Sequence, residues 1–203
     1  MEKIDFKKEL KYLYKASAKE VSVVEVPPMN FLVIEGHGDP NTSSEYMEAI
    51  EAIYPVAYAL KFKVKKSKGI DYVVMLLEGL WWTDDPAQFS MDNKEIWNWT
   101  AMIMQPEHVT KEMYEEAVAE VGKKKDLRAL TKMRFETYEE GLSVQILHMG
   151  PYAEEGPTIA RLHDYIKDHG YRFNGKHHEI YLSDPRKTAP EKLKTILRQP
   201  VTS

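Results

Sequence analysis

The stretch "VSVVEVPPMNFLVIEGHGDP", residues 21–40, decides how the fold begins. Its first six residues are rich in β-branched side chains, a Pro-Pro pair breaks the run, and alternating apolar residues follow. This pattern predicts two strands that flank a turn at Pro27 and Pro28. Gly36 and Gly38 permit a tight turn into the next element. They resemble a phosphate-binding loop only superficially, because a third glycine and a Lys-Ser/Thr pair are missing.

A helix is predicted next, over residues 41–63. Thr42 with Glu45 three residues later forms a capping box, and apolar residues follow at helical spacing. Pro55 is expected to kink this helix or to end its first segment. Two further strands are predicted in "DYVVMLLEGLWW" (71–82) and "IWNWTAMIMQP" (96–106).

The second half of the chain repeats this order of elements. "QILHMGPY" leads into a helix over residues 156–170 as "VIEGHGDP" leads into the first one. Pro157 near the start and Gly170 at the end are the residues expected at helix termini. The predicted strands are "KMRFETY" (132–138), "LSVQILHMG" (142–150), "HHEIYLSDP" (177–185) and "KLKTILRQPV" (192–201).

We therefore predict an α+β fold built from duplicated β-β-α-β-β halves with pseudo-twofold symmetry and a central ligand groove. The chain would be a single domain, residues 1–203. Its first half would span about 17–106, a linker helix capped by Thr110 about 110–124, and its second half about 128–202. Grooves at such interfaces are where ligand sites tend to form.

Composition excludes several classes of function. The 203 residues are 43% hydrophobic and 11% aromatic, which is typical of a globular chain. The 28 basic and 32 acidic residues are interspersed, so a nucleic-acid partner is not expected. Cysteine is absent, which excludes disulfides, thiolate metal sites and a cysteine nucleophile.

The N-terminus and the lengths of the apolar runs predict where the protein is located. The start, "MEKIDFKKEL", shows no apolar stretch of a secretory signal, and runs such as "YVVMLL" are too short to span a bilayer. A cytoplasmic protein without a membrane partner is expected. The sequence does not predict its oligomeric state.

The strand that begins at residue 177 carries the first candidate site residues. Alternation places His177, Glu179 and Tyr181 on one face, with His178 and Ile180 on the other. Because one face is aliphatic and the other mixes a carboxylate with a phenol, we predict that Glu179 and Tyr181 line a pocket. A solvent-exposed position for the glutamate is the simpler alternative.

Glu78, near the end of the corresponding strand in the first half, is the second candidate carboxylate. The predicted pseudo-twofold would bring Glu78 and Glu179 toward one groove. Glu78 also precedes the Leu-Trp-Trp triplet at 80–82, where a carboxylate would lose hydration. This environment favours proton transfer or the recognition of a cation, and the sequence does not decide which of the two glutamates would be a base.

The tryptophans are the remaining candidates for ligand contacts. Core packing accounts for some of them, yet neighbouring indoles on one strand must point to opposite faces. A cluster of indoles beside a groove suits flat, hydrophobic, polycyclic ligands. The predicted ligand-binding residues are Glu78, Trp81, Trp82, Trp97, Trp99 and Tyr152.

Metal binding and serine chemistry have less support. His177 and Glu179 share a face, but no third ligand stands at a recognisable spacing. The nucleophile elbow of a serine hydrolase is also missing. No metal or organic cofactor is predicted.

Four segments resemble the GyrI-like family, which is named for a DNA gyrase inhibitor and also supplies the ligand-sensing part of multidrug-responsive regulators. They are "LYKASAKEVSVVEVPPMNFLVIEGHGDPNTSSEY" (13–46), "MLLEGLWW" (75–82), "WNWTAMIMQPEHVT" (97–110) and "HHEIYLSDPRKTAPEKLKTILRQPV" (177–201). The chain is most similar to the stand-alone subgroup that lacks a DNA-binding domain.

The resemblance implies a pocket for amphipathic aromatic compounds and a role for particular residues. An acidic residue that reads the positive charge of the ligand in the sensor domains corresponds to Glu179, with Tyr181 on the same wall. Members of the stand-alone subgroup hydrolyse cyclopropanoid genotoxins, so the implied function is a hydrolase with Glu179 as base and Tyr181 as hydrogen-bond donor. The alternatives are a binding or sensor module without turnover and a gyrase-inhibitor-like protein that binds another protein.

Overall fold

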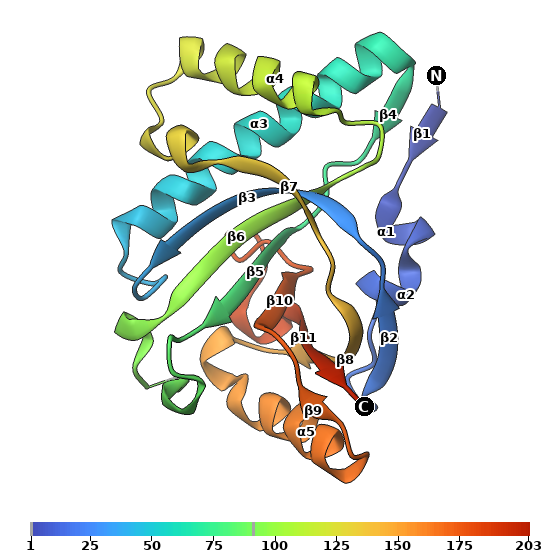
Figure 1. Ribbon diagram of the computed structural model, residues 1–203, viewed down its shortest axis with the longest axis vertical. Helices are drawn as coiled ribbons and strands as arrows, with labels where there is room; N and C mark the ends of the chain where they lie inside the picture. Colours follow the sequence, from blue (N-terminus) through green and yellow to red (C-terminus); the bar gives the residue numbers. More distant parts are fainter. Residues whose placement is uncertain (1, 91) are drawn as a thin grey trace.

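A computed structural model describes residues 2–90 and 92–203 of the chain (Figure 1). The fold is α+β, as predicted, with one large antiparallel sheet and helices packed against it. At the N-terminus, strand β1 (Glu2–Ile4) pairs in parallel with β4 (Ile70–Tyr72) in a separate small sheet. Two short helices, α1 (Phe6–Glu9) and α2 (Lys11–Tyr14), connect β1 to the main sheet.

Among the described residues the main sheet has nine strands: eight follow the order β2-β8-β11-β10-β5-β6-β3-β7, and β9 pairs with β11 outside this order. Their bounds are β2 (Ser22–Val26), β3 (Met29–His37), β5 (Leu77–Trp82), β6 (Asn98–Gln105), β7 (Arg134–Tyr138), β8 (Gly141–Met149), β9 (Arg172–Phe173), β10 (His177–Tyr181) and β11 (Lys194–Thr202). The run predicted as one strand at 71–82 is therefore divided between β4 and β5.

When each strand is replaced by its counterpart in the other half, the same order results, read from the opposite edge of the sheet. The first strand of each half, β2 or β7, pairs with the second strand of the other half, β8 or β3. The third strands, β5 and β10, pair with each other at the centre. This arrangement agrees with the order of elements predicted from the sequence, while the duplication and the boundaries of the halves stay predictions.

Three longer helices cover the sheet: α3 (Ser44–Lys68), α4 (Lys111–Lys124) and α5 (Gly156–Asp168). Helix α3 packs against β3 and β6, α4 packs on α3, and α5 packs against β8 and β11. Figure 1 shows α3 and α4 at one end of the molecule and α5 at the other. Among the described residues, no helix combines the length and the apolar character needed to cross a membrane.

The helix termini follow the predicted chemistry with two corrections. Ser43, and not Thr42, caps α3 and accepts a hydrogen bond from the Tyr46 amide at 3.3 Å. Pro55 lies inside α3, which continues to Lys68, so the expectation that it ends a first segment is wrong. Thr110 caps α4 as predicted, accepting from the Met113 amide at 3.3 Å.

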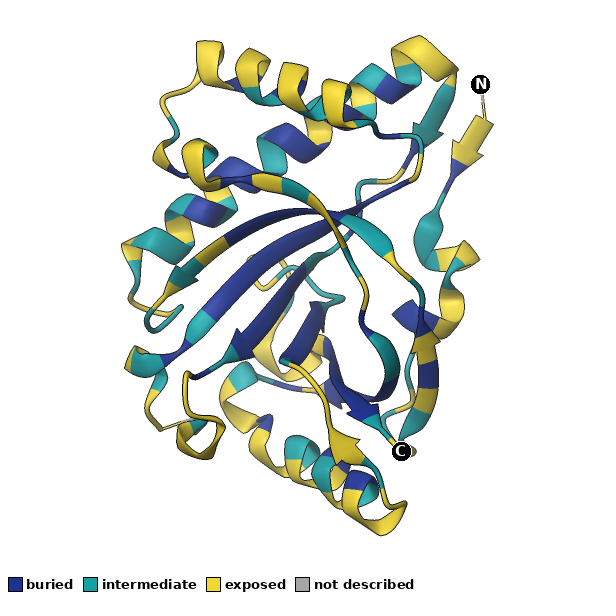
Figure 2. Ribbon diagram, viewed as in Figure 1, coloured by how far each residue is buried: buried dark blue, intermediate teal, exposed yellow. Residues whose placement is uncertain are grey.

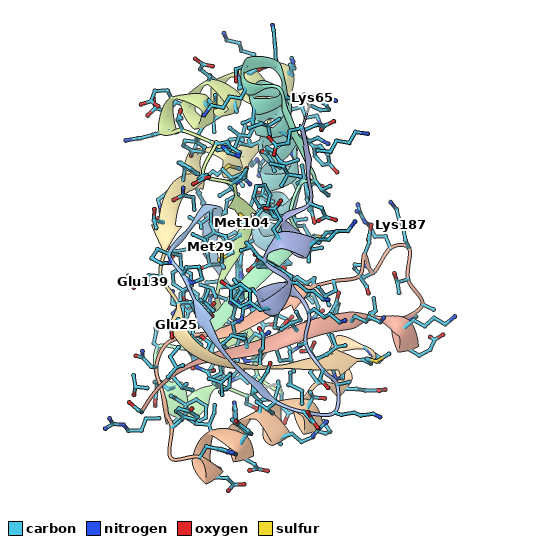
Figure 3. The ribbon with its side chains drawn as sticks, turned by 90° about the vertical axis from the view of Figure 1, so that its right-hand side faces the viewer. Glu25, Met29, Lys65, Met104, Glu139 and Lys187 are labelled. Atoms are coloured by element: carbon cyan, nitrogen blue, oxygen red, sulfur yellow. The ribbon has the colours of Figure 1, made fainter. Side chains whose placement is uncertain are left out.

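The hydrophobic core lies between the sheet and the helices, as the burial colours in Figure 2 show. Its largest fully buried side chain is Trp99. A smaller cluster joins α5 to β8 and β11 through Leu162, Ile166 and Ile146. Figure 3 shows Lys187, in the connection from β10 to β11, extending away from the sheet. Most residues of the central strands β5 and β10 are buried, and their alternate side chains decide what each face of the sheet can do.

Candidate functional site

Strands β5 and β10 form the floor of the candidate site. In their antiparallel register Glu179 pairs with Gly79, and His177 pairs with Trp81. Paired residues project to the same face, so His177, Glu179, Tyr181 and Trp81 share one side of the sheet. We call this the site face and the opposite side the reverse face. The predicted alternation along β10 is confirmed.

Glu179 is held by two neighbours on its own strand. Its Oε2 accepts a hydrogen bond from the Tyr181 hydroxyl at 2.8 Å, and its Oε1 lies 3.3 Å from His177 Nε2. The Tyr181 oxygen in turn accepts a bond from Trp81 Nε1 at 3.2 Å. Only 6% of Glu179 is exposed. The carboxylate is thus oriented by two side chains in a place with little water.

A second carboxyl group, Glu155, meets Glu179 from the start of α5. Each carboxyl group is among the influences on the pKa of the other. Glu155 occupies the N-cap position of α5 but makes no capping bond with its side chain, and only 1% of the residue is exposed. Its Oε1 has no N–H or O–H donor within reach among the described residues. The carboxyl group is therefore directed into the site and not at the helix end.

The two carboxyl groups differ in their affinity for a proton. Burial raises the pKa of Glu155 well above its ordinary value, and the charge of Glu179 raises it further. Burial also acts to raise the pKa of Glu179, but hydrogen bonds from His177, Tyr181 and Glu155 outweigh it and lower that pKa. Near neutral pH the pair consequently holds one proton, which resides on Glu155, and one negative charge, which resides on Glu179.

Three of the predicted tryptophans gather on the site face. The ring centroids of Trp81 and Trp97 lie 5.6 Å apart. Tyr46, from the first turn of α3, lies 5.7 Å from Trp81 and 5.0 Å from Trp99 in an edge-to-face contact. These are the distances of favourable aromatic pairs. Tyr46 thus joins the three indoles into one aromatic cluster beside Glu179.

Two further aromatic rings border this cluster. Phe89, in the connection from β5 to β6, stacks on Trp97 with centroids 4.8 Å apart and also faces His177 at 6.0 Å. Tyr152 meets Tyr181 edge-to-face at 5.7 Å and is only partly buried. Tyr152 therefore stands at an edge of the site, as its predicted role in ligand contact requires, although that role itself stays a prediction.

Two glycines create room for the indoles. A Cβ on Gly79 would lie 2.8 Å from Trp81 Nε1 and 3.0 Å from the Tyr181 hydroxyl, both too close for van der Waals contact. A Cβ on Gly36 would lie 2.2 Å from the Trp99 ring. The absence of a side chain opposite Glu179 lets Trp81 and Tyr181 close over the strand.

Trp82 and Glu78 do not join this group. Trp82 projects to the reverse face, and the Lys176 ammonium lies 3.4 Å from the centroid of its ring. Glu78 pairs with Ile180 on the reverse face. The prediction that Glu78 and Glu179 converge on one groove is therefore wrong. The residue opposite Glu179 is Gly79, and a shift of one position along a strand changes the face.

Glu78 instead belongs to a closed polar network on the reverse face. Its two oxygens accept hydrogen bonds from the Tyr14 hydroxyl and from His178 Nε2, both at 2.8 Å. The other ring nitrogen of His178 lies 2.8 Å from Glu140, which also receives a bond from Arg198 at 3.1 Å. Both oxygens of Glu78 are occupied by protein partners, so the prediction that it contacts a ligand gains no support from this geometry.

The charges in this network stabilise one another. Burial acts to lower the pKa of His178, but Glu140 and Glu78 outweigh it and raise that pKa to about 9. Glu140 is buried too, yet His178 and Arg198 lower its pKa to about 2. Arg198 also donates to the Leu13 carbonyl at 2.7 Å, which ties the N-terminal segment to the sheet. The network is thus a buried structural element whose side chains are paired with one another.

Sequence reasoning missed Glu155, Tyr46 and the hydrogen-bonding part of His177. Glu155 carried one recognisable signal, because glutamate is not among the residues preferred at an N-cap. Tyr46 was visible only as part of the apolar face of a helix, and no spacing rule links it to a strand 30 or more residues away.

The structure also has a groove of about 460 Å³ between α3 and α4. Its lining includes Pro55, Tyr58, Phe62, Lys66 and Val121. None of the residues predicted for the site lines this groove. It is thus a feature separate from the cluster around Glu179.

The chain matches a known class of ligand-binding domain. The model of the GyrI-like small molecule binding domain matches residues 19–202, so the chain belongs to that family. This confirms the family predicted from the sequence. No protein of curated function matches the chain.

Solved structures extend this similarity over nearly the whole chain. An uncharacterised conserved protein from Listeria innocua is 41% identical with a TM-score of 0.91, over 98% of this chain and 100% of that one. A protein from Listeria innocua described as a hydrolase is 40% identical with a TM-score of 0.85, over the same shares. The C-terminal domain of EcmrR, 15% identical with a TM-score of 0.57 over 91% of this chain and 98% of that domain, shares the fold.

Proposed function

We propose that the protein hydrolyses flat aromatic compounds that carry a strained electrophilic ring, with Glu179 as the general base. The observation that carries this proposal is an ionised, buried carboxylate held by Tyr181 and His177 beside a cluster of indoles. A general base must be oriented and able to accept a proton, and Glu179 meets both conditions. The hydrolase from Listeria innocua, at 40% identity, supports the class of reaction.

The substrate class follows from the family resemblance together with the aromatic cluster. Spirocyclopropane compounds of the cyclopropanoid type are planar, hydrophobic and already strained. Such a ligand would stack on Trp81 and Trp97 with its cyclopropane methylene toward Glu179. Ring strain supplies much of the driving force, so the residues need only position a water molecule and accept one proton from it.

The chemical step uses the groups on β10. Water attacks the methylene carbon and gives a proton to Glu179, while the carbon–carbon bond breaks and its electron pair passes to the conjugated carbonyl oxygen. The Tyr181 proton is held by Glu179 in the free protein. Tyr181 thus orients the Glu179 carboxylate while it takes the proton of water. Glu179 then releases that proton to solvent, and the phenolate oxygen at the far end of the ring is protonated from solvent, so the product is the substrate plus one water.

Mass spectrometry after incubation with a spirocyclopropyl cyclohexadienone tests the proposal directly. The wild-type protein should form a product heavier than the substrate by one water. Glu179→Gln, which preserves shape, should lower the rate by about 10²–10⁴-fold. Glu154→Gln, an exposed neighbour of the site, is the matched control and should retain the wild-type rate. Equal rates for Glu179→Gln and the wild type would show that Glu179 is not the base.

A second function is favoured by the same negative charge. An anionic carboxylate enclosed by indoles attracts aromatic cations, because both the carboxylate and the ring faces are negative. The protein would then bind and sequester such compounds without turnover. Quenching of tryptophan fluorescence by a planar aromatic cation, with no water adduct of any tested substrate, would support this binding function over the hydrolase.

A further inference from the structure

The groove between α3 and α4 exposes two large aromatic side chains at one end of the molecule (Figure 1). Tyr58 is 48% exposed and Phe62 is 59% exposed. They lie four residues apart on α3, so they share one face of the helix. Figure 2 shows that much of α4, across the groove, is exposed as well. Exposed rings that gather beside a groove are typical of an interaction surface.

Oppositely charged residues lie on either side of these rings along the same face of α3. Glu51 comes seven residues before Tyr58, and Lys66 comes eight residues after it. Glu51 lines a second hollow, of about 150 Å³, while Lys66 lines the groove itself. Both charged residues are exposed, and neither makes an ion pair with another described residue of the chain. This face of α3 is therefore acidic at one end, aromatic in the middle and basic at the other end.

Helix α4 carries a similar change of charge in the opposite direction. Lys63 Nζ on α3 lies 3.6 Å from Glu120 Oε2 on α4. Arg128, beyond the end of α4, lies 3.8 Å from Glu48 near the start of α3, so the two helices are antiparallel. Along α4, Glu120 therefore lies beside the basic part of α3, and Lys124 lies nearer the acidic part. Each helix has an acidic and a basic end.

A twofold axis perpendicular to the helices would reverse both of these patterns. With the axis just after Tyr58, Lys66 of one copy lies opposite Glu51 of the other, and Phe62 lies opposite Pro55. The charges on α4 are reversed in the same way. A symmetric dimer brings one surface patch against itself, so the patch must be self-complementary. We propose that this groove is the interface of a homodimer in which α3 and α4 of two copies pack antiparallel.

The distribution of charge favours a second copy of the chain over another kind of partner. An acidic segment would be attracted to the basic end of α3 and repelled by its acidic end, and a basic segment would meet the reverse. The rings in the middle supply the apolar contact of the interface, and the charges set its register. The inference goes beyond the proposed function, because none of the residues predicted for the site around Glu179 lines this groove.

Sedimentation velocity over a range of protein concentrations tests the dimer. The wild type should approach twice the mass of one chain, and Phe62→Lys should weaken dimerisation by about tenfold or more. Phe173→Lys is the matched control, because this ring is 50% exposed on β9, away from α3 and α4, and it should dimerise as the wild type does. Circular dichroism should verify that both variants are folded. A wild type that stays monomeric at every concentration, or a dimer that Phe62→Lys does not weaken, would overturn the proposal.

Reversal of the charges tests the antiparallel register. Lys66→Glu would set two carboxylates against each other, and Glu51→Lys would set two ammonium groups against each other. Each contact occurs twice in the symmetric dimer, so each variant alone should weaken dimerisation by about tenfold or more. The double variant, and an equimolar mixture of the two single variants, should restore it. Dimerisation that stays weak in both of these samples would overturn the proposal, whatever the outcome for hydrolysis.

Discussion

The two faces of the β5–β10 strand pair differ in how completely their buried polar groups are hydrogen-bonded. On the reverse face, His178 uses both ring nitrogens and Glu78 uses both oxygens in hydrogen bonds. On the site face, buried atoms without a partner among the described residues include His177 Nδ1, Trp99 Nε1 and Glu155 Oε1. Fully paired networks fix a structure, whereas unpaired buried groups mark places where a ligand or water acts.

This contrast teaches that burial of a charge does not by itself indicate function. Glu78 is fully buried and Glu179 nearly so. Their neighbours distinguish them, because Glu78 belongs to a closed network with Tyr14 and His178, whereas Glu179 lies beside the aromatic cluster and its pKa is influenced by a second buried carboxyl group, Glu155. The comparison predicts that changes on the reverse face reduce stability and that changes on the site face reduce activity or binding.

The largest expected effect on stability is that of His178→Ala. The substitution leaves Glu78 and Glu140 buried without their shared cation, and loss of one partner from a buried ion pair costs about 3–5 kcal/mol. Urea unfolding monitored by circular dichroism measures this change. Glu179→Gln is the paired variant on the site face and should destabilise the fold less. A larger loss for Glu179→Gln would reverse the assignment of the two faces.

The pH dependence of stability provides the next test. The pKa of His178 is about 9 in the folded protein and about 6.5 in an unfolded chain. A raised folded-state pKa gives stability that is complete below pH 6.5 and is lost as the pH rises through 9. The free energy of unfolding should therefore fall by a few kcal/mol over this interval.

His178→Gln isolates this contribution, because glutamine does not titrate. Its free energy of unfolding should be lower than that of the wild type at pH 6.5 and should change less between pH 6.5 and 9. Parallel pH curves for the two proteins would assign the wild-type loss of stability to another group. At acidic pH the relevant group is Glu140. Its pKa is lowered to about 2 in the folded protein, so its contribution to stability is lost only as the pH falls through 2.

Much of the fold could be predicted from the sequence because local patterns determine it. Alternation, Pro-Pro and Gly punctuation and helix caps identified the strands of both halves and the three long helices. The same alternation placed Glu179 and Tyr181 on one face. Pro55 was one of the exceptions, since packing of α3 against the sheet outweighed the local cost of proline within a helix.

The predicted site was less complete because cross-strand register is not a local property. Glu78 was assigned as the counterpart of Glu179, and the register opposes Gly79 to Glu179 instead. Because of this error of one position, the Glu78 carboxylate was predicted on the site face although it lies on the reverse face. Glu155 was missed because its contact with Glu179 depends on how α5 is placed against β10, which no short sequence pattern records.

Gly79→Ala tests the packing that closes the site face. Its new methyl would clash with Trp81 and Tyr181, and overpacking of this kind costs about 1–3 kcal/mol. The strain is steric alone, because Gly79 does not have a positive φ angle. Gly122→Ala, on α4, is the matched control: its methyl meets Leu130 at an ordinary 3.8 Å, and alanine favours a helix. Thermal unfolding should show a loss for the first variant and none for the second.

The smallest expected effect compares the adjacent indoles Trp81 and Trp82. Trp81 lies in the cluster beside Glu179, whereas Trp82 lies under Lys176 on the reverse face. Trp81→Leu should weaken the binding of a planar aromatic ligand by about 0.5–1.5 kcal/mol, the value of an aromatic contact. Trp82→Leu should change it by less than about 0.5 kcal/mol. Equilibrium dialysis avoids the altered fluorescence of both variants, and a greater loss of affinity in Trp82→Leu would place the ligand on the reverse face.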